Sequence, residues 1–258
     1  MISYCVCCFR ATYGKMQLEE LVAKTTVPYE ILLWINTPDP SVAEKAAELA
    51  ARGVPIKVVG NTPQNIGMNA FKLLFKAAKY DMIAQLDDDV IRISPNIPQK
   101  CAHIFLHRKD VKYLVADVWQ DEYTTGNRPA MNQYKLYAPD HQLYDGPIDS
   151  WYGVYHRSIM PVLMRAPYEK YFYLGSFVRG YLPKDKKIGV LCTQFKVLHA
   201  CGPIYANYFG LLENEIQKYK SVKMPGMAEG YAKAKQPARE LVEARFEEAK
   251  KHIDSFGL

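Results

Sequence analysis

Long apolar runs and a secretory leader are both missing from this sequence. No stretch approaches the roughly 18 apolar residues that a membrane-spanning helix needs. The opening residues, MISYCVCCFR, lack the basic start and the small-residue cleavage site of a signal peptide. These absences predict a protein without a transmembrane segment in a reducing, cytoplasmic setting, where cysteines remain free thiols.

Cysteine pairs with zinc-finger spacing are also lacking. The chain has six cysteines, and the cluster of Cys5, Cys7 and Cys8 has no second cluster at a distance typical of zinc sites. In a strand, Cys5 and Cys7 share one face and Cys8 takes the other, as small core residues do. We therefore interpret the cluster as part of a buried strand.

Concentrated basic runs are equally scarce. Lys and Arg total 33 against 27 Asp and Glu, a formal net charge of +6, and the basic residues are scattered along the chain. Nucleic-acid binders usually gather their basic residues in runs or stripes. The charge pattern argues against a nucleic-acid partner and fits a small substrate that bears phosphate.

The first half of the sequence alternates strand-like and helix-like segments. Strand-like runs are found at 2–9, 29–35, 55–59 and 81–86. Helix-like segments lie between them at 15–24, after Ser41 and at 68–80, and Ser41 with Glu44 has the pattern of a capping box. This alternation predicts a parallel sheet with helices on both faces. In such sheets, ligands bind at the carboxyl ends of the strands.

The second half is less regular. We expect a helix at 97–107, a strand at 112–119, a Tyr-rich hairpin or loop at 120–143, a strand at 150–155, a short helix at 158–165 and a strand at 189–198. The chain then turns helical, and its last helix carries an apolar stripe formed by Ala238, Val242, Phe246, Ala249 and Ile253. That stripe predicts packing on the domain, with docking to a partner or to a membrane surface as the alternative.

Three consecutive aspartates, Asp87, Asp88 and Asp89, end the fourth strand-like run in the sequence IAQLDDDV. Like charges repel one another and burial makes each more costly, so a positive group is expected beside them. Hard divalent cations are commonly held by one or two carboxylates plus substrate phosphates. A solvated turn or helix cap is the alternative. The position at the end of a buried strand favours a site for Mn²⁺ or Mg²⁺.

The stretch from Ile2 to Asp89 resembles the nucleotide-binding half of a GT-A fold glycosyltransferase, most similar to glycosyltransferase family 2. The family's first strand, second strand, Asn-x-Gly loop and Asp-x-Asp strand have their counterparts in ISYCVCCF, YEILLWIN, NIGMNAF and LDDDV. The resemblance covers roughly residues 2–200. It implies an α/β fold with a mixed, mostly parallel sheet flanked by helices. It also implies metal-dependent transfer of a sugar from a UDP- or GDP-linked donor to a hydroxyl of a glycan or other acceptor.

With this resemblance we predict a catalytic domain at 1–203 and a helical extension at 204–258. Within the domain, residues 1–95 would form the nucleotide- and metal-binding half and 96–203 the acceptor half.

By position, the resemblance assigns roles to the three aspartates. Asp87 would approach the ribose or the metal-bound diphosphate, Asp89 would ligate the metal, and Asp88 would assist either. His199, in VLHACG after the last core strand, would complete the metal shell with Asp87 and Asp89, and imidazole is an acceptable ligand for Mn²⁺. A lone histidine bonded to the backbone at a strand end is the other interpretation of His199.

The same resemblance outlines the donor pocket. Phe9 and Arg10 at the end of the first strand, and Asn36 at the end of the second, would flank the nucleobase. Asn65 and Gly67 would line the same pocket. The family often has an Asp where this chain has Asn36, which keeps the hydrogen bonding and loses the charge, so the identity of the base is left open.

The match fails where inverting members of the family carry an acidic pair at the start of a helix. That acid removes the proton from the acceptor hydroxyl, so it must sit beside the acceptor. By spacing, this chain has Gly175 and Ser176 there, and neither can serve as a base. Asp149 and Glu169 are the nearest carboxylates in sequence, although each is also typical of a surface or capping residue. Because a retaining reaction needs no such base, the stereochemistry is left open.

Aromatic residues crowd the expected acceptor side, among them Trp151 and Tyr152 in the strand predicted at 150–155. Sugar C–H faces stack on aromatic rings, so we expect Trp151 first, with Tyr152, to contact a saccharide acceptor. Some of these residues belong to the core instead if the strand alternates inward and outward.

Three other functions fit parts of the pattern. A haloacid-dehalogenase-like phosphatase also has Asp-x-Asp after an apolar strand, but normally on the first strand. A sugar nucleotidyltransferase would need a glycine-rich phosphate loop after the first strand, which CCFRATYGK lacks. A GT-A-like module that binds glycan or nucleotide without catalysis would explain the missing acidic pair.

Overall fold

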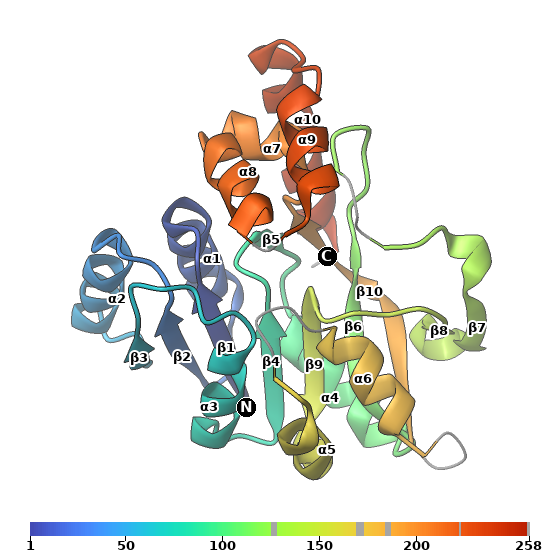
Figure 1. Ribbon diagram of the computed structural model, residues 1–258. Coiled ribbons are helices and arrows are strands. Elements are labelled where there is room, and N and C mark those ends of the chain that lie inside the picture. Colours follow the sequence, from blue (N-terminus) through green and yellow to red (C-terminus); the bar gives the residue numbers. More distant parts are fainter. Residues whose placement is uncertain (125–127, 169–172, 184–186, 222, 257–258) are drawn as a thin grey trace.

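The strands form one sheet in the computed structural model, which describes residues 1–124, 128–168, 173–183, 187–221 and 223–256 (Figure 1). The strands are β1 (Ile2–Cys8), β2 (Tyr29–Ile35), β3 (Ile56–Asn61), β4 (Met82–Leu86), β5 (Val90–Ile93), β6 (Val111–Val118), β7 (Lys135–Ala138), β8 (Leu143–Asp145), β9 (Tyr152–His156) and β10 (Ile188–His199).

Helices flank this sheet and follow it at the C-terminal end. The α-helices are α1 (Ala11–Lys24), α2 (Ser41–Ala51), α3 (Asn69–Ala77), α4 (Ile97–His107), α5 (Met160–Arg165), α6 (Leu174–Tyr181), α7 (Pro203–Tyr208), α8 (Leu212–Ser221), α9 (Pro225–Lys233) and α10 (Arg239–Ser255). Short 3₁₀ turns are η1 (Met131–Gln133), η2 (Pro139–His141) and η3 (Arg157–Ile159). Among the residues that the structure describes, no helix combines the length and apolarity that crossing a membrane requires.

The sheet is mixed, with a parallel half and an irregular half. Its strands run in the order β3-β2-β1-β4-β9-β6-β10-β8-β7, and β5 pairs with β10. β3, β2, β1 and β4 are parallel, as the alternating pattern predicts. β9 is antiparallel to both β4 and β6. Because the strand order reverses after β3, right-handed crossovers put α1 and α2 on one face and α3 on the other.

The cysteine-rich first strand is the centre of the parallel half. All residues of β1 are buried, and Cys5, Cys7 and Cys8 are free thiols in the core. A parallel strand covered by helices on both faces is apolar along its whole length. The prediction that this cluster is core is therefore confirmed.

The capping box predicted at the start of α2 is wrong. Ser41 is the first helical residue rather than the N-cap, which is Pro40. The main-chain N–H of Ser41 donates to Asp39 Oδ1 at 2.9 Å. A carboxylate two residues before the helix thus satisfies one of the free N–H groups of its first turn.

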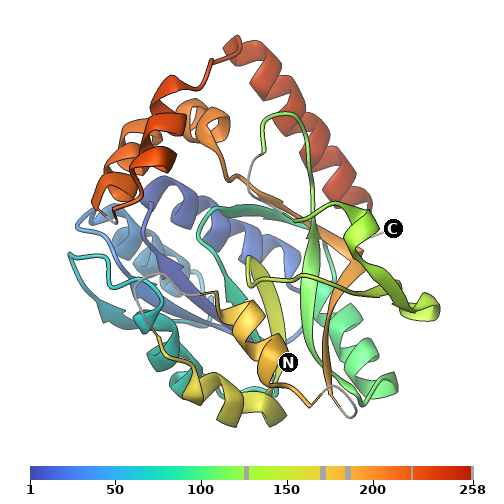
Figure 2. The same ribbon diagram turned by 45° about the vertical axis from the view of Figure 1, so that its right-hand side comes forward.

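The C-terminal helices gather at one end of the sheet, next to the turn between β4 and β5 (Figures 1 and 2). The last helix packs on the domain. Val242, Ala249 and Ile253 are buried in one cluster with Tyr13 of α1, and Phe246 is partly buried against it. From Val242 onward the apolar stripe is therefore used within the chain, whereas Ala238 is the exposed N-cap residue of α10.

Candidate functional site

The three aspartates form the turn between β4 and β5. The N–H of Val90 donates to the carbonyl of Asp87 at 3.0 Å, and the N–H of Asp87 donates to the carbonyl of Trp151 at 3.0 Å. Gln17, buried in α1, donates from Nε2 to the carbonyls of Asp87 and Val90 at 2.6 and 3.0 Å. Hydrogen bonds to its main chain thus fix the turn. The three carboxylate side chains are not needed for these bonds and point in different directions.

Asp88 points into the protein, and both of its oxygens are engaged. Oδ2 accepts from the N–H groups of Phe9 at 2.9 Å and Arg10 at 2.6 Å. Oδ1 accepts from Arg10 Nε at 3.0 Å and also from Arg10 Nη2. Phe9 and Arg10, which the sequence analysis places beside the nucleobase, therefore hold Asp88. Their contacts fix the start of α1 against the acidic turn.

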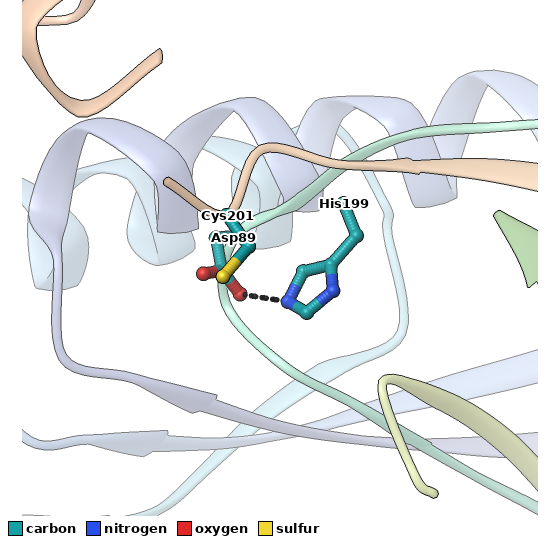
Figure 3. Close-up of side chains that lie close together, drawn as sticks. All are labelled: Asp89, His199 and Cys201. Carbon is teal, nitrogen blue, oxygen red and sulfur yellow. Dashed lines mark hydrogen bonds and ion pairs between the residues drawn. The ribbon is translucent and has the colours of Figure 1, made fainter. Parts of the chain in front are cut away.

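Asp89 and His199 meet directly, with 2.9 Å between Asp89 Oδ1 and His199 Nε2 (Figure 3). Asp87 Oδ2 lies 3.9 Å from the same nitrogen. The other oxygen of Asp89 accepts from Arg10 Nη1 at 2.8 Å. The structure thus brings together Asp87, Asp89 and His199. Their role as metal ligands stays a prediction.

The charges in this group perturb one another. Partial burial raises the pKa of Asp87, and the neighbouring charge of Asp89 adds to that effect against the opposing influence of His199. Burial also acts to raise the pKa of Asp89, but Arg10 and His199 outweigh it and hold this pKa well below its usual range. Burial acts to lower the pKa of His199, yet Asp89 and Asp87 raise it. Without a metal, the arrangement therefore favours a protonated imidazole beside an ionised carboxylate.

The donor atoms fit a hard or borderline divalent cation. Asp87 and Asp89 supply carboxylate oxygens, and an imidazole nitrogen is compatible with Mn²⁺. His199 Nδ1 is buried and has no hydrogen-bond partner in the described part of the chain, so the ring is oriented through Nε2. Cys201 Sγ lies within 4.8 Å of the ligand atoms of Asp89 and His199. Burial raises the pKa of this thiol to about 12 in the metal-free protein. Sulfur is also a soft ligand, so Cys201 suits Mn²⁺ or Mg²⁺ less well than the carboxylates do.

Asn36 and Asn65 lie together at the ends of β2 and β3. Asn36 Nδ2 donates to Asn65 Oδ1 at 2.6 Å, and Asn36 Oδ1 accepts from the N–H of Ile66 at 2.8 Å. Gly67 has a φ of 57°, in the left-handed region that favours glycine, and its N–H donates to Asn65 Oδ1 at 2.7 Å. The buried Asn36 amide thus shapes the loop that the sequence analysis assigns to the donor pocket.

Asp149 contacts the start of α6, where Gly175 and Ser176 stand in place of the family's acidic pair. Its Oδ1 accepts from the N–H groups of Ser150 at 2.8 Å and Gly175 at 3.1 Å, so it binds the first turn of α6 from outside. A Cβ on Gly175 would lie 2.6 Å from Asp149 Cα, so no side chain fits there. Burial raises the pKa of Asp149, and Asp149 in turn raises that of Asp87. The other candidate base, Glu169, lies outside the described residues.

The two predicted acceptor contacts are core residues, and that expectation is wrong. Tyr152 is completely buried, and Trp151 is buried with its Nε1 donating to the carbonyl of Ala116 at 2.8 Å. Residues 152–155 of β9 are all buried, so both faces of this strand are covered, and Trp151 directly precedes it. The contribution of Trp151 is its carbonyl, which supports the acidic turn.

Two further charged residues, which no sequence pattern singled out, are linked to the turn through Arg10. Glu215 of α8 accepts from Arg10 Nη1 at 3.3 Å, and Lys218 of the same helix donates to Glu215 Oε2 at 2.5 Å. Glu215 and Arg10 are 205 residues apart in sequence. Only the docking of α8 brings them together, so no local pattern could have found them.

Comparison with known proteins identifies the fold. No family model matches the chain, and no curated protein matches its sequence. The S. aureus TarS 1-349 structure in complex with UDP matches with a TM-score of 0.59 and 13% identity over 84% of this chain and 64% of that one. The mannosyltransferase PcManGT from Pyrobaculum calidifontis, in complex with GDP-Man and Mn²⁺, matches with a TM-score of 0.53 and 9% identity over 96% and 80%. The chain has a GT-A fold.

The GT-A assignment confirms the fold predicted from the sequence. It also removes the support for a haloacid-dehalogenase-like phosphatase, because the aspartates follow β4 rather than the first strand. The chain spans less than two thirds of the TarS segment. In the complex of that segment with UDP-GlcNAc, the match covers 58% of the segment and 76% of this chain, with a TM-score of 0.56 and 12% identity.

Proposed function

We propose that this GT-A protein is a metal-dependent glycosyltransferase that moves a sugar from a nucleoside-diphosphate sugar to a hydroxyl. The observation that carries the proposal is the convergence of Asp87, Asp89 and His199 at the carboxyl end of β4. Ligands of open α/β sheets bind at such strand ends. The bound UDP, UDP-GlcNAc and GDP-Man of the structural neighbours support a nucleotide sugar as the ligand.

In this proposal the aspartates have separate roles. Asp89 and His199 hold Mn²⁺ or Mg²⁺, and Asp87, whose side chain is 40% exposed, extends toward the ribose or the diphosphate. The ion supplies positive charge that stabilises the departing diphosphate. Asp88 stays bound to Arg10 and keeps the turn in place. The loop shaped by Asn36 and Asn65 lies beside the nucleobase.

Asp149 is the proposed general base. It is partly buried close to Asp87, and its raised pKa suits proton transfer better than that of an exposed carboxylate. The absence of a side chain at Gly175 favours a second candidate, a GT-A module that binds the nucleotide sugar without turning it over. Donor hydrolysis separates the two functions, because only the enzyme releases free sugar.

The first test is thermal unfolding with UDP and GDP, with and without Mn²⁺. We expect one of the nucleotides to raise the melting temperature by about 5 °C or more when it is present at a hundredfold excess over its dissociation constant. Removal of the metal with EDTA should abolish most of that increase. If both nucleotides leave the melting temperature unchanged at every metal concentration, the chain has no donor site of the proposed kind.

A further inference from the structure

Arg10 connects the acidic turn to α8 of the C-terminal segment through ion pairs. Arg10 Nη1 bridges Asp89 at 2.8 Å and Glu215 at 3.3 Å. Lys218 pairs with Glu215 at 2.5 Å. The side chains of Glu215 and Lys218 are only 3% and 14% exposed. Burying a charged pair where a helix packs on the domain carries a desolvation penalty. Apolar residues at the same positions would give a more favourable free energy of folding.

The acidic turn, Arg10, His199 and α8 form one connected cluster of charged residues. The carboxylates of Asp88, Asp89 and Glu215 face the cations of Arg10, Lys218 and the protonated imidazole of His199. A divalent ion that replaces the proton on His199 would add positive charge to this cluster and so favour an anion beside it. Lys218 is linked to Asp89 through Glu215 and Arg10, so its ammonium group lies on the side of α8 that faces the predicted metal site.

Arg10 and Lys218 differ in how freely they can reach a ligand. Arg10 is fixed by contacts to Asp88, Asp89 and Glu215. Lys218 has one carboxylate partner among the described residues, and its ammonium is a compact charge on a flexible stem. It can therefore turn from Glu215 to a phosphate oxygen without disturbing the acidic turn.

We propose that Lys218 contacts the diphosphate of the nucleotide sugar and that Glu215 is a positioning residue that holds Lys218 and Arg10 at the site. This inference rests on the proposed function. It makes residues 204–258 part of the donor site rather than an appendage that follows the catalytic domain.

The experiment compares Lys218→Met with Lys220→Met, an exposed lysine on the same helix. Affinity for UDP or GDP, whichever the wild type binds, is measured by calorimetry with saturating Mn²⁺. Lys218→Met should weaken nucleoside diphosphate binding about 10- to 100-fold, the range for a hydrogen bond to a charged group. Lys220→Met should leave it unchanged. Binding of the corresponding nucleoside, followed by NMR, should be the same in all three proteins, because it lacks the diphosphate.

Two further variants separate a ligand contact from a structural role. Lys218→Arg keeps the charge and should recover most of the affinity. The double variant Glu215→Gln/Lys218→Met removes the carboxylate that Lys218→Met alone would leave without its lysine, and it should lose diphosphate affinity while staying folded. Unchanged diphosphate binding in Lys218→Met, or an equal loss for nucleoside and diphosphate, would overturn the inference. A wild type that binds no nucleoside diphosphate would instead overturn the proposed function on which it rests.

Discussion

Replacing Asp89 with asparagine should abolish the increase in melting temperature that Mn²⁺ and nucleotide produce together. It should also lower donor turnover by about 100-fold or more, since a catalytic metal supplies several kcal/mol of transition-state stabilisation. Asp89 is the carboxylate that touches His199 and also accepts from Arg10. An amide keeps the size and one acceptor oxygen but cannot offer the charge that the ion requires.

The variant should remain folded, because Arg10 keeps its contacts with Asp88 and Glu215. Asp140→Asn, which changes an exposed aspartate in η2, is the matched control and should behave as the wild type. Thermal unfolding without ligand measures the fold, and titration with Mn²⁺ and nucleotide measures the site. A full metal-dependent increase in the Asp89→Asn protein would remove Asp89 from the metal site.

Replacing Asp149 with asparagine should leave donor binding intact and reduce turnover by about 10²- to 10⁴-fold, the usual contribution of a general base. The amide oxygen can still accept from the N–H groups of Ser150 and Gly175, so α6 stays in place. The expected signature is a fall in kcat with little change in the affinity for the nucleotide sugar. Donor hydrolysis supplies the assay.

The anomeric configuration of the released sugar gives an independent measurement of the same role. If Asp149 activates the attacking hydroxyl or water, the product should form with inversion, which NMR of freshly released sugar detects. Retention of configuration together with a fully active Asp149→Asn protein would show that Asp149 only caps α6. The proton would then leave by another route, such as the donor phosphate.

The parallel half of the fold was predictable because its mainly apolar strands alternate with helix-like segments. The bounds of β2 and α4 agree with the segments expected from the sequence. β5 was not predicted, since four residues next to a turn give too short a pattern and its pairing partner β10 lies far away in sequence. The position of the acidic turn was predictable because three consecutive aspartates directly follow an apolar, strand-like run.

The partners of that turn were only partly predictable. His199 followed from its place after the last core strand, whereas Gln17, Glu215 and Lys218 lie in helices whose docking no local pattern reveals. Tyr152 was misassigned because β9 is interior, so an aromatic residue in it fills the core instead of facing a ligand. Sequence thus indicated the charged centre of the site, and packing decided which side chains surround it.

The central claim is that one divalent ion sits between the acidic turn and a nucleoside diphosphate. Anomalous scattering from a crystal grown with Mn²⁺ and UDP or GDP tests it most directly. We predict one manganese peak in coordination contact with Asp89 and His199 and with phosphate oxygens of the nucleotide. A nucleotide bound in the crystal with no manganese at Asp89 and His199 would contradict the account.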